Sequence, residues 1–304
     1  KINGRPLKFL LEKQYPGRIY PVNPKYTDIA GLACYPDAAA IPGDVNLAIV
    51  AVPAALVPAA IDDLGRKAVP AAVIFSSGFG EMGADGARLQ AGLEARARAA
   101  GIRVCGPNCL GLVNAFERVI ATFGQYGDGA VPPGPVAFVT QSGAFGTAIA
   151  ALARRRDLGL GYFVNTGNEA DVDFVEVMRA LIEDPRVAVG AGYLEGLREG
   201  CGLAGLAEVA LRAGKPLVLT KVGRTSAGAR AAASHTGALA SADSVFEGVA
   251  SGLGIVRARN EEHMLDLVEV LARCPLPGGA GLAIVTQSGG AGVLAADRAE
   301  ELGL

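Results

Sequence analysis

A chain of 304 residues is longer than most single hydrophobic cores, so two or more domains are expected. Hydrophobic residues make up 51% and charged residues 19%, which excludes a wholly disordered chain. The net charge is -2 with both signs interspersed, so there is no basic stripe for nucleic acid or for an anionic membrane surface.

The best candidate for a membrane span is the uncharged run 45–61, but it contains Pro53 and Pro58. We predict instead a strand followed by a helix with Pro53 in its first turn. The five cysteines include no CxxC pair, and two histidines are too few to complete a typical metal site with them. We therefore expect no metal, and free thiols in a reducing cytoplasm.

Short β-branched runs alternate along the chain with Ala- and Leu-rich amphipathic stretches. The predicted strands are 19–22, 47–52, 71–75, 103–105, 136–140, 161–164, 187–194, 216–221, 254–256 and 281–286. The predicted helices include 84–100, 143–156, 172–183, 203–213, 242–251 and 261–273. This alternation predicts an α/β fold with parallel, doubly wound sheets, in which ligands bind at the carboxyl ends of the strands.

Two Gly- and Pro-rich segments, 126–135 and 274–281, separate the periodic blocks. After the second segment the chain repeats itself, since 139–146 reads VTQSGAFG and 285–292 reads VTQSGGAG. We predict three domains: 1–130, with its first strand missing, then 131–275, then 276–304. The last is expected to continue beyond this sequence, because one βα unit cannot bury its own apolar face.

Each TQSG turn follows a predicted strand and opens a predicted helix, with Ser142 or Ser288 at the N-cap position. A helix start offers unpaired N–H groups and the positive end of the dipole, which suit a phosphate. Simple capping of a helix is the alternative. The presence of two copies, one for each domain, favours a phosphate site.

The segment 221–240 has few large apolar residues and carries His235, one of only two histidines. A long loop of small residues at the end of a strand is typical of functional positions. Neutral imidazole attacks phosphorus well when a carboxylate holds its other nitrogen. Glu195 ends a strand at the same predicted edge and could supply that carboxylate. A structural histidine and a solvated glutamate remain the alternatives, and His263 is interpreted as a surface residue.

The motifs RAAASHTGALA, YLEG, VTQSGAFG, NTGNEADVDF and CGPNCLGLVN occur in an order that resembles the NDP-forming acyl-CoA synthetases. These are relatives of the succinyl-CoA synthetase alpha subunit and of ADP-forming acetate–CoA ligase. The resemblance implies a Rossmann-like CoA-binding domain followed by flavodoxin-like domains. It also implies that His235 is phosphorylated with support from Glu195. Two helix starts would cradle the phosphate, formed by Ser142, Gly143 and Ala144 and by Ser288, Gly289 and Gly290.

The CoA site is implied by the same resemblance. Lys25 would bind a CoA phosphate, and the path of the adenosine and pantetheine would follow Val52, Pro53, Ser76, Ser77, Asn108 and Cys109. ATP or GTP with Mg²⁺ would be held by an ATP-grasp domain outside this sequence, fused or in a beta subunit of an oligomer. The carboxylic acid would bind near Phe145 and residues 165–169.

The implied activity couples ATP or GTP to the formation of a CoA thioester through a phosphohistidine and an acyl phosphate. One alternative is an acyl-CoA-sensing regulatory region of a protein acetyltransferase-like protein, and such regions tend to lack the phosphorylatable histidine. A dinucleotide-binding oxidoreductase is a second alternative. It is disfavoured because no complete GxGxxG turn follows a strand.

Overall fold

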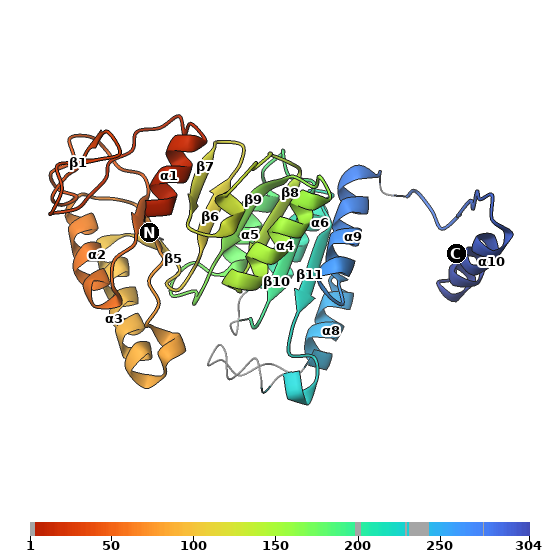
Figure 1. Ribbon diagram of the computed structural model, residues 1–304. Helices are drawn as coiled ribbons and strands as arrows, with labels where there is room; N and C mark the ends of the chain where they lie inside the picture. The colour runs from red at the N-terminus through yellow and green to blue at the C-terminus, as the bar shows by residue number, and fades with distance from the viewer. Residues whose placement is uncertain (1–3, 198–201, 229, 231–242, 276) are drawn as a thin grey trace. The chain divides into compact units, whose positions relative to one another are not determined.

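The computed structural model describes residues 4–197, 202–228, 230, 243–275 and 277–304 (Figure 1). His235 therefore lies outside the described residues. The chain divides into two compact units, Lys1–Ala272 and Arg273–Leu304. Across the described ranges, no helix is long and apolar enough to cross a membrane.

The larger sheet of the first unit has seven strands in the spatial order β12-β11-β10-β8-β9-β6-β7. Their bounds are β6 (Gly111–Asn114), β7 (Val119–Thr122), β8 (Val136–Thr140), β9 (Leu160–Asn165), β10 (Val189–Leu194), β11 (Leu217–Lys221) and β12 (Val256–Arg257). The strands β12, β11, β10, β8 and β9 are parallel, and β6 and β7 add an antiparallel hairpin beside β9. The carboxyl ends of the parallel strands thus share one edge.

Helices cover both faces of this sheet, as Figure 1 shows. Their bounds are α1 (Arg5–Glu12), α4 (Gly143–Arg155), α5 (Phe174–Ile182), α6 (Leu203–Arg212), α8 (Asp243–Gly252) and α9 (Glu261–Arg273). Alternate side chains of β8 point to opposite faces. Val136 and Phe138 pack with α1, α4 and α9, whereas Ala137 and Val139 pack with α5, α6 and α8. The predicted α/β, doubly wound class is confirmed for this part of the chain.

A smaller parallel sheet has the order β3 (Ala48–Val50), β4 (Ala71–Ile74) and β5 (Arg103–Cys105). One face packs on α2 (Val57–Arg66) and α3 (Ala84–Ala100). The other face meets the hairpin of the larger sheet, where the rings of Phe75 and Phe123 lie 4.9 Å apart. This apolar contact between the two sheets places their loops next to one another.

Short elements also occur in the described part of the first unit. They are the antiparallel pair β1 (Asp28–Ile29) and β2 (Leu32–Ala33) and the 3-10 turns η2 (Ala54–Leu56), η3 (Gly80–Met82) and η4 (Gln125–Gly127). The described part of the second unit contains one helix, α10 (Gly289–Glu301).

Three sequence predictions need correction. Residues 19–22 form no strand, and Val22 makes only an isolated bridge with Tyr35, because Pro21 lacks the N–H donor that a ladder requires. Residues 281–286 are also not a strand, since the described part of the second unit offers no neighbouring strand for pairing. The α-helix after Pro53 begins only at Val57, because η2 occupies the intervening turn.

The hairpin β6–β7 has a consequence for the domain limits. It lies within the predicted first domain yet pairs with β9 of the larger sheet. Membership of a sheet therefore does not follow the predicted limits 1–130, 131–275 and 276–304, which stay predictions.

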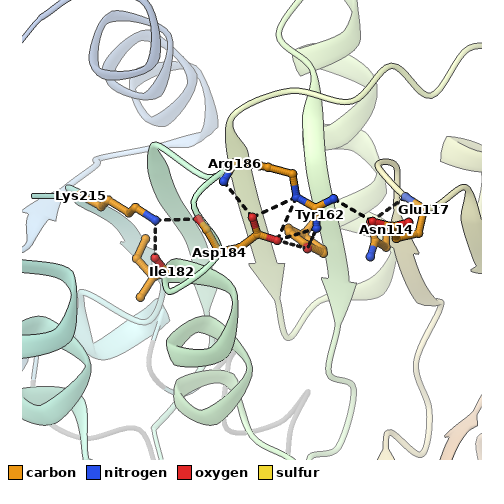
Figure 2. A network of polar contacts seen from close by, with 7 residues as sticks. All are labelled: Asn114, Glu117, Tyr162, Ile182, Asp184, Arg186 and Lys215. Atoms are coloured by element: carbon orange, nitrogen blue, oxygen red, sulfur yellow. Dashed lines mark hydrogen bonds and ion pairs between the residues drawn. The ribbon is translucent and has the colours of Figure 1, made fainter. Parts of the chain in front are cut away.

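A polar network at the amino ends of the parallel strands ties this hairpin to the sheet (Figure 2). The Arg186 guanidinium donates to Glu117 Oε1 at 2.8 Å, to Tyr162 Oη at 3.0 Å and to Asp184 Oδ2 at 2.7 Å. Lys215 Nζ donates to the Asp184 carbonyl oxygen at 2.7 Å. Hydrogen bonds from Arg186 and then Tyr162 hold the pKa of the Asp184 carboxyl well below its usual range. Asp184 is thus the acceptor at the centre of the network.

Replacing Asp184 with Asn should lower the free energy of unfolding by about 1–2 kcal/mol, because the amide nitrogen faces donors from Arg186 and Tyr162. That corresponds to about 2–4 °C in Tm for each kcal/mol. The folded pKa of Asp184 is depressed, so its contribution is present above the unfolded value of about 3.9 and is lost as pH falls below it. Thermal unfolding of wild type and D184N between pH 3 and 8, monitored by circular dichroism, measures the difference in their stability.

Asp44 is exposed and makes no side-chain hydrogen bond to another described residue, so Asp44→Asn provides the matched control. A difference between wild type and D184N that does not narrow as the pH drops below about 4 would contradict the assigned role.

Candidate functional site

The first TQSG turn lies at the carboxyl edge of the larger sheet, between β8 and α4. Ser142 is the N-cap of α4, but its side chain accepts no capping hydrogen bond. Thr140 Oγ1 donates to the Ser142 carbonyl oxygen at 2.9 Å and fixes the turn. The Ser142 hydroxyl is therefore not used for capping, and the N–H groups of Gly143 and Ala144, which open the helix, have no partner within the helix. This arrangement can receive an anion.

The second TQSG turn has a related local geometry within its own unit. Thr286 Oγ1 donates to the Ser288 carbonyl oxygen at 3.3 Å, and Ser288 Oγ accepts from Ala291 N at 3.4 Å. Ser288 thus caps α10 with its side chain, which Ser142 does not do for α4. At Gly289 and Gly290 the space around the backbone is open.

Gln141 is a residue that the sequence analysis missed. Its Oε1 accepts from Glu195 N at 2.7 Å and from Gly196 N at 3.1 Å, and its Nε2 donates to Gly196 O at 2.7 Å. One side chain of the first TQSG turn therefore fixes the backbone that carries Glu195, the predicted carboxylate. The only available signal was its place in the repeated TQSG motif.

Glu195 directly follows β10 and is half-buried. Burial, with a smaller contribution from the Glu195 charge, raises the pKa of the neighbouring Tyr193 to about 12. The Tyr193 ring lies 4.8 Å from that of Phe145 in the first turn of α4. The structure thus brings Glu195, Phe145 and the turn at Ser142 together at one edge.

Asn165, at the end of β9, ties this edge to the smaller sheet. Its Nδ2 donates to the carbonyl oxygens of Thr140 at 2.9 Å and Gln141 at 3.0 Å. Its Oδ1 accepts from Leu110 N at 2.6 Å. Leu110 directly follows the predicted CoA residues Asn108 and Cys109. One buried amide therefore joins the turn predicted to bind phosphate to the loop predicted to bind CoA.

Glu169 is a carboxylate buried in the same β9–α5 loop, with 6% of its surface exposed. Its Oε1 accepts from Thr166 Oγ1 at 2.8 Å and from Phe174 N, the first residue of α5, at 3.0 Å. Burial raises the pKa of Glu169, although these hydrogen bonds oppose the effect. Glu169 thus stabilises the loop and the start of α5.

The loops after β3, β4 and β5 lie in a row. Ser76 Oγ donates to Val52 O at 2.5 Å, and Asn108 N donates to Ser76 O at 2.9 Å. Pro53, Ser77 and Asn108 are exposed along this row. They offer small side chains, an amide and backbone groups, which suit an extended ligand such as CoA.

Two of the predicted CoA residues are placed differently. The Cys109 thiol is buried and donates to Ile74 O at 3.3 Å, so only its backbone could meet a ligand. Lys25 lies in an exposed turn in which its own amide donates to Asn23 Oδ1 at 3.0 Å. Within the described ranges, no hydrogen bond joins Lys25 to the row of strand-end loops.

Comparison with known proteins matches both parts of the chain to families. Residues 2–115 match a CoA binding domain, and residues 133–271 match a succinyl-CoA ligase like flavodoxin domain. The acetate–CoA ligase [ADP-forming] I of Archaeoglobus fulgidus is 38% identical over 96% of this chain and 42% of its own length. The acetate–CoA ligase [ADP-forming] I subunit alpha of Pyrococcus furiosus is 37% identical over 100% of this chain and 66% of its own length.

A solved structure agrees with these matches. The dinucleotide forming acetyl-coenzyme A synthetase 1 of Ca. Korarchaeum cryptofilum, in complex with phosphate and ADP, superposes with a TM-score of 0.93. It is 38% identical over 100% of this chain and 64% of that chain. This chain belongs to the ADP-forming acyl-CoA synthetase family. It spans between 42% and 66% of the length of these relatives.

Membership in the synthetase family confirms the predicted fold class, a CoA-binding domain followed by a flavodoxin-like domain. The roles of the individual residues stay predictions. Among the described residues, no group of three or more His, Cys, Asp or Glu side chains could hold a metal ion.

Lys221, which the sequence analysis did not single out, ends β11 where the segment carrying His235 begins. It is buried, with 1% of its surface exposed, and its Nζ donates to Val222 O at 3.0 Å. Burial lowers the pKa of this ammonium group. A lysine at the end of a predominantly apolar strand was the sequence signal that could have identified it. In this synthetase family member, the segment 221–240 that carries the predicted phosphohistidine thus begins at a buried cation.

Replacing Gln141 with Ala should loosen the loop that carries Glu195, because three hydrogen bonds to its backbone are lost. At about 1 kcal/mol for each bond, the Glu195 and Gly196 amides should exchange with solvent at least about tenfold faster. Hydrogen exchange measured by NMR or mass spectrometry tests this. The exposed Gln125 provides the control variant Gln125→Ala. Unchanged exchange at residues 195 and 196 would show that Gln141 does not hold the loop.

Proposed function

We propose that this chain is the CoA-binding and phosphohistidine-bearing part of an NDP-forming acyl-CoA synthetase. The observation that supports it most is the contact made by Asn165. Its side chain donates to the carbonyl oxygens of Thr140 and Gln141, which precede Ser142. It also accepts from the N–H of Leu110, which follows Cys109. A phosphate turn and a CoA loop held this close suit a reaction in which a thiol displaces phosphate.

The proposed reaction has three steps. The His235 imidazole takes the terminal phosphoryl group of ATP or GTP, and the nucleoside diphosphate leaves. The phosphohistidine then transfers the group to an oxygen of the carboxylic acid, which gives an acyl phosphate and restores the imidazole. The CoA thiol finally attacks the acyl carbon and releases inorganic phosphate. Such transfers depend mainly on positioning and on stabilisation of charge.

Each predicted residue has a distinct role in this scheme. Glu195 would accept a hydrogen bond from the second nitrogen of His235 and keep the attacking nitrogen deprotonated. Ser142, Gly143 and Ala144 would bind the phosphoryl oxygens through N–H groups and the Ser142 hydroxyl. Ser288, Gly289 and Gly290 have the same proposed role, binding of phosphoryl oxygens through N–H groups and a hydroxyl. CoA would bind to the three loops that follow the strands of the smaller sheet, at Val52–Pro53, Ser76–Ser77 and Asn108–Cys109. Lys25 would bind one of the CoA phosphates.

The partners follow from the same proposal. A nucleotide with Mg²⁺ would bind in an ATP-grasp domain, fused or in a separate beta subunit of an oligomer. The name subunit alpha of the Pyrococcus furiosus relative supports a separate subunit. The carboxylic acid would bind beside Phe145 and residues 165–169. We place the protein in the cytoplasm, in keeping with the described cysteines at 34, 105, 109 and 274, which form no disulfide.

His235→Ala should abolish incorporation of phosphate from γ-labelled ATP into the complete enzyme, because no nucleophile replaces the imidazole. The wild-type label should be acid-labile, base-stable and discharged by CoA together with a carboxylic acid. Gel autoradiography after acid or base treatment measures it. The other histidine provides the matched control, since His263→Ala should retain the label. Equal label in H235A and wild type would exclude the phosphohistidine.

Lys25→Ala should weaken CoA binding about tenfold, because a charge-assisted hydrogen bond to a phosphate is lost. Isothermal titration of CoA into the chain measures it. Lys8→Ala is the matched control, since Lys8 is an exposed lysine of α1 that pairs with Glu12 in the same helix. Equal affinities for the two variants would remove Lys25 from the CoA site and leave the strand-end loops as its basis.

A further inference from the structure

Residues 165–169, called loop 165–169 below, run from the last residue of β9 into the connection to α5 and are fixed at both ends to different parts of the molecule. At its start, Asn165 binds the turn before Ser142, as described above. At its other end, Asn168 N donates to Pro107 O at 2.9 Å, next to Asn108. The loop therefore bridges the two candidate binding sites directly.

The Asn168 side chain is the centre of the contact with the smaller sheet. Its Nδ2 donates to Glu81 Oε2 at 2.5 Å and to Gln90 Oε1 at 3.1 Å. Its Oδ1 accepts from Asn108 Nδ2 at 3.1 Å. The Glu81 carboxylate can only accept, so the amide of Asn168 must turn its nitrogen to Glu81 and its oxygen to Asn108. The orientation of Asn108 is thereby set as well.

Glu81 is itself held in place, so it provides a firm anchor. Its Oε1 accepts from Gly78 N at 2.5 Å and Phe79 N at 3.2 Å in the loop that follows Ser76 and Ser77. Burial would raise the pKa of Glu81, but the hydrogen bonds from Asn168, Gly78 and Phe79 outweigh it, and the net pKa is lowered. The carboxylate thus links Asn168 to a second of the predicted CoA loops.

Gly167 makes the bridge stiff. It adopts a φ of +60°, and a Cβ at this position would lie 2.4 Å from Pro107 O and 2.7 Å from Asn108 O. The backbones of the two loops therefore pack directly on one another, and neither can shift without displacing the other.

We propose that Asn168 is a positioning residue through which CoA and phosphate bind cooperatively. This rests on the proposed function, in which CoA occupies the loops at Ser76 and Asn108 and phosphate occupies the turn at Ser142. Because the two loops cannot move independently, the position that the first ligand imposes on loop 165–169 is already in place when the second ligand binds. Because binding linkage is reciprocal, each ligand strengthens the other by the same factor.

The test is isothermal titration of CoA into the full chain in a phosphate-free buffer, with and without saturating inorganic phosphate. In wild type, phosphate should strengthen CoA binding by about fivefold or more. In Asn168→Ala both ligands should still bind, but the factor by which phosphate strengthens CoA binding should fall to below about twofold. Glu81→Gln should act likewise, because its amide nitrogen would face the Asn168 nitrogen while its oxygen still accepts from residues 78 and 79.

The control is Asn114→Ala at the opposite edge of the sheet, where Asn114 Oδ1 accepts from Glu117 N at 3.2 Å. This variant also loses an asparagine hydrogen bond, yet it should keep the wild-type factor. CoA binding that phosphate leaves unchanged in wild type overturns the coupling alone. A loss of the factor in N114A equal to that in N168A overturns the role of Asn168. Absence of CoA binding in wild type overturns the proposed function, and the coupling with it.

Discussion

The arrangement of the candidate site depends on one buried amide, that of Asn165. A buried amide must find partners for its donors and its acceptor, or the cost of removing it from water is not recovered. Asn165 is fully buried, and its three partners lie on three different segments: the end of β8, the turn after it, and the loop after β5. Satisfying this one group therefore requires the turn at Ser142 and the segment at Leu110 to be adjacent. The position of Gln141, and through it that of Glu195, follows.

The two edges of the larger sheet are built differently. At the amino edge, Arg186, Asp184 and Tyr162 form a network of mutual donors and acceptors that holds the β6–β7 hairpin in place (Figure 2). At the carboxyl edge, much of the fixing is done by backbone carbonyls and amides bound to Asn and Gln side chains. Neutral amides can fix a loop without adding charge, which suits an edge that is proposed to receive phosphate. The hairpin connects the two, because β6 runs from Gly111 beside the site to Asn114 at the network.

Much of the fold could be predicted from periodicity alone. Where prediction failed, the failure has a physical cause. The parallel strands 136–140 and 103–105 and the helices 84–100 and 261–273 have the predicted bounds, because each element buries one regular stripe or a continuous apolar run. The hairpin β6–β7 was missed, since each of its strands has only four residues, which is too few for a clear alternation. Residues 281–286 have the composition of a strand, but pairing requires a partner that composition does not reveal. Within the site, the TQSG repeat identified Ser142, whereas Asn165, Asn168 and Gln141 act by contacts between distant segments, which no local pattern encodes.

The joint between the two sheets explains why these distant contacts can be precise. The proposed thioester-forming reaction needs the thiol and the acyl phosphate within contact of each other, and small displacements weaken such catalysis strongly. Phe75 of the smaller sheet packs edge to face on Phe123 of the hairpin, and Val73 and Cys109 lie in the same buried cluster. Apolar packing of this kind holds the two sheets together but specifies orientation poorly. The side-chain amides of Asn165 and Asn168 fix the relative orientation that apolar packing leaves unspecified. Each amide can satisfy its donors and acceptor in only one arrangement. The two parts of the proposed active site are thus held together by apolar packing and aligned by two asparagines.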